Sequence, residues 1–191
     1  MTRLPPLPYD AIDPEQREIW DRIVATRGGI GSMTDATGSL IGPFHALVRR
    51  PSVGKHLLEV GQNLRFGNAA PDSLLEIAIC TVGAHWKSEF EFWAHSRFAL
   101  AAGVSQAALD ALAAGTAPDF DRPEEQLVHA WAHALVTTGH TDESQYTDLV
   151  DAIGLDAVID LTLTCGYYCQ ISFVLNAFAV ALPDGVDPVW H

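Results

Sequence analysis

Apolar residues recur at intervals of three and four through most of this chain, and no stretch of useful length alternates as a β-strand does. Residues three and four apart share one face of a helix, whereas residues two apart share one face of a strand. The spacing therefore predicts an all-α fold. A faint similarity between the two halves also suggests an internal pseudo-repeat.

Proline, glycine and short polar residues divide this pattern into segments. Asp13-Pro14-Glu15 is typical of a helix start, Gly103 of a helix end, and Ser105 of a new N-cap. We expect two short helices between residues 43 and 64, a helix from about 71 to a junction that includes His85 and Lys87, and further helices at about 14–26, 88–102, 106–114, 121–138, 141–153 and 155–182, the last as one helix or a pair. Residues 1–41 are interpreted as an N-terminal arm and helix, and residues 42–191 as the main helical domain.

The charge balance limits what the chain can bind. Its 191 residues carry a formal net charge of −13. Nucleic acids and anionic membrane surfaces require basic patches, so neither is an expected partner. Three cysteines at irregular spacing do not indicate a disulfide framework. With no apolar run of ~20 residues and no signal peptide, we expect a cytoplasmic protein that acts on a small molecule.

Three other features have open roles. The Gly-rich segment 28–38 is long enough for a lid but lacks the GxxxxGK[ST] pattern of a phosphate loop. His129 and His133 have a spacing that suits a metal, but no third ligand accompanies them and no metal is expected. Cys165 and Cys169 are four apart, unlike a redox C-x-x-C pair.

The segment from Glu76 to His95 contains the strongest candidate for a reactive site. Glu91 precedes His95 by four positions, so the two side chains share a helix face, and Glu76 lies in the preceding apolar helix. Burial and pairing shift carboxylate and imidazole pKa values toward neutrality, where proton transfer is most effective. The aromatic residues expected around this group are Phe90, Phe92, Trp93 and Phe98.

Structural roles are the alternative interpretation. Ser88-Glu89-Phe90-Glu91 fits the S-x-x-E capping box, in which Ser88 accepts from a backbone N–H and Glu91 reaches back. Glu76 could equally be a glutamate at the edge of its helix whose carboxylate is exposed or held by a partner. His95 could equally be a core histidine whose ring nitrogens are hydrogen-bonded for structural reasons.

From Gly42 to Leu112 the residues resemble the carboxymuconolactone decarboxylase family, whose superfamily includes AhpD-type alkylhydroperoxidases. The similarity rests on Leu75-Glu76-Ile77-Ala78, on Phe90-Glu91-Phe92-Trp93-Ala94-His95 and on Ala102-Gly103-Val104-Ser105. It implies an AhpD-like helical bundle, with residues 42–191 as the family domain. It also implies a homo-oligomer such as a trimer or hexamer.

The peroxidase branch of this superfamily carries C-x-x-C before the histidine, and Ser88 and Glu91 occupy those cysteine positions. Peroxide reduction through sulfenic acid and disulfide requires thiols. The decarboxylase branch carries Glu and His and needs no cofactor. The resemblance thus implies a cofactor-independent carboxy-lyase acting on a small unsaturated acid or lactone.

In this interpretation His95 is the general acid, Glu91 orients it and Glu76 tunes the pair. The residues expected to bind substrate are Ser88, Trp86, Lys87 and Phe92. Two alternatives stay open. One is an AhpD-like peroxidase using Cys80 or the pair Cys165 and Cys169, and the other is a family member that binds or transforms an unrelated small molecule.

Overall fold

The computed structural model describes residues 2–27 and 33–190, which form nine α-helices, one short 3₁₀ helix and a single isolated β-bridge. The helices are η1 (Tyr9–Ala11), α1 (Pro14–Arg27), α2 (Phe44–Arg49), α3 (Pro51–Phe66), α4 (Asp72–His85), α5 (Glu89–Ala101), α6 (Gln106–Ala114), α7 (Pro123–Thr138), α8 (Glu143–Ile153) and α9 (Leu155–Ala177). The all-α prediction is confirmed, and residues 155–177 form one helix rather than a pair. Residues 28–32 of the predicted lid lie outside the described part of the chain.

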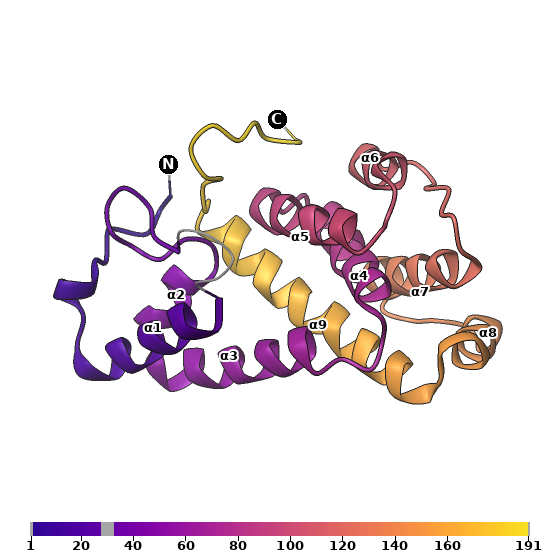
Figure 1. The fold of residues 1–191 in the computed structure, drawn as a ribbon, viewed down its shortest axis with the longest axis horizontal. Coiled ribbons are helices and arrows are strands. Elements are labelled where there is room, and N and C mark those ends of the chain that lie inside the picture. The colour runs from indigo at the N-terminus through magenta and orange to yellow at the C-terminus, as the bar shows by residue number, and fades with distance from the viewer. Residues whose placement is uncertain (1, 28–32, 191) are drawn as a thin grey trace.

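Helix α9 crosses the molecule diagonally, with α1–α3 on one side and α6–α8 on the other (Figure 1). It contacts α3, α4, α5, α7 and α8. Helix α4 is the most buried element, because all its residues from Ser73 to Gly83 are buried. The elements that carry the predicted site therefore lie in the middle of the bundle.

The apolar core is divided into clusters. The largest surrounds α4 and includes residues of α5, α6, α7, α8 and α9. A second joins α1, α2 and α3 and contains Ile12, Ile19, Trp20, Ile23, Leu40, Val48 and Leu58. This second cluster spans the boundary that the sequence analysis places after residue 41.

Several predicted helix ends are present. The Asp13 carboxylate accepts from the backbone N–H of Gln16 at 2.8 Å at the start of α1. Ser105 accepts from the backbone N–H of Ala108 at 3.2 Å at the start of α6. Gly103 follows α5 with φ +93°, a backbone conformation that side chains with a Cβ rarely adopt.

The expectation that no segment is apolar and long enough to span a bilayer is wrong for helix α9. Its 23 residues meet both requirements by length and composition, and the charges Asp156 and Asp160 stand near its start. In its most apolar window 44% of the residues are buried inside the bundle, and core helices of helical proteins can meet the same two requirements.

Candidate functional site

The predicted site is built on the hairpin of α4 and α5. Residues 86–88 form a tight turn that folds α5 back against α4. Lys87 occupies the left-handed region in this turn, with φ +47°. The turn brings Glu76 of α4 beside His95 of α5, although 19 positions separate them in the sequence.

His95 lies between two carboxylates. Its Nδ1 is 2.7 Å from Oε2 of Glu76, and its Nε2 is 3.0 Å from Oε1 of Glu91. All three residues are buried. The predicted catalytic residues Glu76, Glu91 and His95 thus form one continuous group, with both ring nitrogens facing acceptors. An imidazolium, which donates from both nitrogens, suits this arrangement.

The protonation state of His95 follows from two opposing effects. Burial by itself lowers the pKa of His95, because it disfavours the charged ring. The negative charges and hydrogen bonds of Glu76 and Glu91 outweigh burial and raise this pKa to about 9. His95 is therefore protonated at neutral pH, and it is suited to donate a proton rather than to accept one.

Arg65 of α3 completes the group from the other side of Glu76. Its guanidinium nitrogen lies 2.7 Å from Oε1 of Glu76, while Oε2 of the same carboxylate faces His95. Among the described residues no aligned hydrogen bond reaches Oε1, so the contact with Arg65 is an ion pair. The guanidinium also lies over the ring of Phe98, 5.0 Å from its centroid.

The aromatic surroundings of His95 differ in part from the prediction. Its ring makes edge contacts with Phe98, at 5.7 Å between centroids, and with Tyr168 of α9, at 5.0 Å. Phe98 was expected and Tyr168 was not. The other predicted rings have different neighbours, because Phe90 packs on Trp93 and Phe92 packs on Trp190 of the C-terminal tail.

The capping-box interpretation of Ser88 and Glu91 is wrong. Ser88 is the N-cap of α5, yet its side chain accepts no hydrogen bond from the helix. Its hydroxyl oxygen is buried with no hydrogen-bond partner in the described part of the chain. Glu91 turns to His95 instead, because a protonated histidine is a stronger partner for a carboxylate than a backbone N–H.

The other predicted substrate-binding residues are dispersed around the turn. Trp86 stacks edge-on against Phe173 and donates its Nε1–H to the Cys169 sulfur at 3.2 Å. Lys87 is exposed, whereas Phe92 is buried beneath the tail. Of the four predicted positions, Ser88 alone offers an unused buried polar group in the described residues. Substrate binding by these residues stays a prediction.

A cavity of about 340 Å³ opens on the outer side of Arg65, and it is lined by Arg65, Phe66, Asn68 and Asp72. It is half open to solvent, and Glu76, Glu91 and His95 do not line it. Arg65 both contacts the buried Glu76 and lines this hollow. Only the packing of α3 against the bundle brings Arg65 to Glu76 of α4, so no spacing along the sequence predicts this ion pair.

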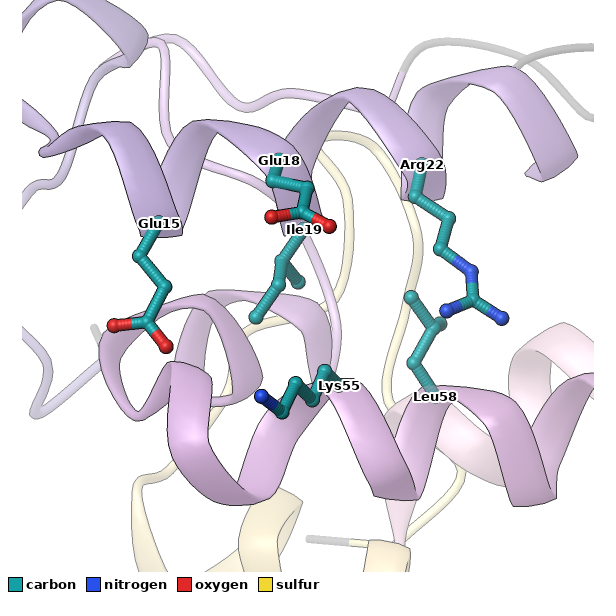
Figure 2. A pocket seen from close by; sticks show the side chains of 6 residues that line it. All are labelled: Glu15, Glu18, Ile19, Arg22, Lys55 and Leu58. Atoms are coloured by element: carbon teal, nitrogen blue, oxygen red, sulfur yellow. The ribbon is translucent and has the colours of Figure 1, made fainter.

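A smaller hollow of about 70 Å³ lies between α1 and α3. Figure 2 shows that Glu15 and Glu18 of α1 face Lys55 of α3 across it. None of the predicted site residues lines this hollow, and its volume falls below that of typical ligand pockets.

The three cysteines are poorly suited to peroxide chemistry. Burial raises the pKa of the Cys80 thiol well above its usual value, and Glu76 and Glu91 raise it further. Burial also raises the pKa of Cys165 to about 12. It raises the pKa of the half-buried Cys169 as well. A reactive cysteine needs a lowered pKa, since the thiolate is the nucleophile.

His129 and His133 lie side by side on α7, with ring centroids 5.8 Å apart. Nδ1 of His129 is 3.2 Å from the Thr81 hydroxyl, which donates to the carbonyl of Ile77. In residues 2–27 and 33–190, no group of three or more His, Cys, Asp or Glu side chains is arranged to hold a metal ion.

No protein-family model matches this sequence, and no curated protein matches it either. Among solved structures, the fold is similar to the crystal structure of an alkylhydroperoxidase AhpD core, an uncharacterized peroxidase-related protein from Ralstonia eutropha JMP134. The TM-score is 0.76 at 15% sequence identity, covering 96% of this chain and 93% of that chain. The chain therefore has an AhpD-like all-α fold, as predicted.

Proposed function

We propose that this protein is a cofactor-independent carboxy-lyase resembling carboxymuconolactone decarboxylase, acting on a small unsaturated carboxylic acid or lactone. The observation that supports the proposal most is the buried Glu76–His95–Glu91 group with a protonated histidine at its centre. Such a group delivers a proton within apolar surroundings, and it does so without thiols at positions 88 and 91.

In the proposed reaction, the substrate carboxylate leaves as CO₂ and the electrons of the broken C–C bond pass into the conjugated carbonyl system. The Nε2 proton that His95 shares with Glu91 then passes through the Glu91 carboxylate to the resulting dienolate carbon, and the pair recovers a proton from solvent. A group with a pKa of about 9 is acidic enough for this step, because a dienolate carbon is far more basic. Glu91 orients the ring, and Glu76 with Arg65 fixes its other nitrogen.

Desolvation supports the loss of the carboxylate. Phe98 and Tyr168 cover the edges of the His95 ring, and burial keeps Tyr168 neutral by raising its pKa well above the usual value. In apolar surroundings a carboxylate is destabilised relative to the delocalised transition state. The proposal also includes a homo-oligomer, in line with the family resemblance.

The test is a panel of unsaturated γ-lactones and carboxylic acids, monitored for CO₂ release. We expect one class to react, and we expect H95Q to lower turnover on it by about 10²-fold or more, the usual contribution of a general acid. H140Q is the matched control because His140 is exposed. Wild-type turnover in H95Q would show that His95 is not the acid.

The same fold also raises the peroxidase alternative, because the similar structure is described as peroxidase-related. The buried, high-pKa thiols of Cys80 and Cys165 disfavour it. Mass spectrometry after peroxide treatment tests this point, and we expect Cys80 and Cys165 to remain unmodified. A disulfide between Cys165 and Cys169 would instead support the peroxidase.

A further inference from the structure

His129 and His133 of α7 are two neighbouring imidazoles that the proposed reaction does not use. They are four positions apart, so their side chains share one face of the helix. Their ring centroids are 5.8 Å apart. His129 is partly buried, whereas His133 is exposed. The pair lies outside the Glu76–His95–Glu91 group and lines neither of the two hollows.

Thr81 of α4 determines which nitrogen of His129 carries the proton. The Thr81 hydroxyl donates its single proton to the carbonyl oxygen of Ile77 at 2.7 Å. Towards His129 it can therefore only accept, so Nδ1 of His129, 3.2 Å away, is the protonated nitrogen. This is the one side-chain hydrogen bond of His129 within residues 2–27 and 33–190. Nε2 is thus left with an unused lone pair.

A fixed proton on one nitrogen is the arrangement found in metal-binding histidines. Such a histidine almost always donates its other ring N–H to an acceptor, which sets the tautomer and the orientation of the ring. Thr81 is buried and supplies this acceptor from a neighbouring helix. The ring of Phe120 packs on His129 from the loop before α7, with 5.7 Å between centroids. His129 is therefore held in place before any ligand arrives.

The spacing of the two rings is close to that of two ligands on one ion. Zn–N bonds of about 2.1 Å place the centroids of two imidazoles on one tetrahedral ion about 5 Å apart. The observed 5.8 Å exceeds this by less than ~1 Å. His133 can close the difference by side-chain rotation, because its ring is exposed and forms no hydrogen bond in the described part of the chain.

The surroundings of the pair indicate which ions would suit it. Besides burial, His133 is the only group that shifts the pKa of His129, so no carboxylate faces the His129 ring. Imidazole donors without carboxylates suit zinc, copper and nickel, whereas magnesium and calcium prefer oxygen. The formal net charge of −13 attracts cations in general.

From this arrangement we infer that His129 and His133 form a chelating site for one divalent transition-metal ion such as Zn²⁺. Nε2 of His129 and one ring nitrogen of His133 are the protein ligands, and water fills the other positions. Pairs of histidines four apart on a helix bind zinc in this way in known metal motifs. A site with two protein ligands is also consistent with the lack of a three-ligand group among the described side chains.

The test is isothermal titration calorimetry at pH 7.5 with Zn²⁺, and with Mg²⁺ as the comparison ion, on the untagged chain after removal of metals by a chelator. We expect saturable binding of Zn²⁺ and none of Mg²⁺. H129Q and H133Q should each weaken Zn²⁺ binding by about tenfold or more, because each removes the chelate. H56Q is the matched control, since His56 is an exposed helical histidine with Ser52 and Val60, not histidine, one turn away.

A second pair of variants tests the role of Thr81 in positioning His129. T81V keeps the shape of the side chain but removes the acceptor for Nδ1–H, and it should weaken Zn²⁺ binding by about tenfold. T81S keeps the hydroxyl and should bind like the wild type. A purely structural role of Thr81 would change the melting temperature without changing Zn²⁺ affinity.

Circular dichroism establishes that H129Q is folded, and the exposed position of His133 makes H133Q the second variant if it is not. Two results would overturn the inference: no saturable Zn²⁺ binding by the wild type, or affinities in H129Q and H133Q that equal those of the wild type and H56Q. The readout is binding of the ion alone. It is therefore independent of CO₂ release and of the proposed lyase activity.

Discussion

Nδ1 of His95 lies 2.7 Å from Oε2 of Glu76, and this contact joins the two helices of the site hairpin. Glu76 also pairs with Arg65 of α3, so one carboxylate links α3, α4 and α5. Because Glu76 is fully buried, its charge is stabilised by these two cations rather than by water. The contact therefore bears on stability as well as on the pKa of His95.

Replacing Glu76 by glutamine should lower both the pKa of His95 and the free energy of unfolding. E76Q removes the negative charge that contributes most to raising the His95 pKa, so this pKa should fall well below 9 in an NMR titration. It also leaves Arg65 without its partner, and we expect a loss of ~3 kcal/mol in the free energy of unfolding. E59Q is the control: it breaks the exposed pair with Arg22 and should change stability by less than ~1 kcal/mol. An unchanged His95 titration in E76Q would contradict the geometry.

His95 should make the protein less stable in alkali. Its pKa is about 9 in the folded state against 6.5 when unperturbed, so the folded state holds the proton more tightly. The resulting stability is fully present below pH 6.5 and is lost as pH rises through 9. Its size is on the order of 3 kcal/mol, at about 1.4 kcal/mol for each pKa unit. Urea unfolding between pH 6 and 10 measures it, and the loss should be smaller in H95Q.

His129 should have the opposite effect in acid. Burial lowers its pKa to about 4, and the nearby His133 contributes. A lowered histidine pKa means that the unfolded chain takes up the proton first, so stability should fall as pH drops from 6.5 toward 4. After allowance for partial exposure, we expect an effect on the order of 2 kcal/mol. In H129Q the unfolding free energy should depend less on pH in this window, and an identical profile would exclude His129 as the cause.

Ser88 offers a test that separates structure from function. Its buried hydroxyl has no partner in the described residues, so S88A removes an unsatisfied polar group and should leave the melting temperature unchanged or raise it. If Ser88 binds substrate, the same variant should raise KM. S105A is the contrasting variant, because the Ser105 side chain does cap α6, and its loss should cost ~1 kcal/mol. A comparable loss in S88A would indicate a structural hydroxyl.

Gly54 marks a close contact between α3 and α2. A Cβ at this position would collide with the carbonyl oxygen of Leu47, which is backbone and cannot rotate away. We expect G54A to destabilise the protein by ~2 kcal/mol or more, measured by thermal unfolding. The control is G166A in α9, where a Cβ meets nothing within 4 Å, and helix propensity predicts a gain of ~0.5–1 kcal/mol. Equal effects would show that α2 and α3 pack less closely.

The predicted site was most accurate where the interactions are local. The pairing of Glu91 with His95 follows from helix geometry, because residues four apart share a face wherever the helix is placed. The capping box at Ser88 was also a local prediction, yet it is wrong, because the Glu91 carboxylate pairs with His95 on the same helix face and Glu76 of α4 helps to keep that ring protonated. A capping pattern predicts the hydrogen bonds that a segment forms in isolation. A side chain of that pattern forms a different contact when a stronger buried partner is available.

The sequence by itself determined the all-α fold, most helix boundaries and the two residues Glu91 and His95, because helix periodicity and caps act over a few residues. Only the tertiary structure decided that Glu76, Arg65 and Tyr168 surround His95, and that Arg27 shares Phe66 with Arg65. These contacts join residues of five helices, α1, α3, α4, α5 and α9. Their geometry depends on how apolar faces pack, and no spacing along the sequence encodes that packing.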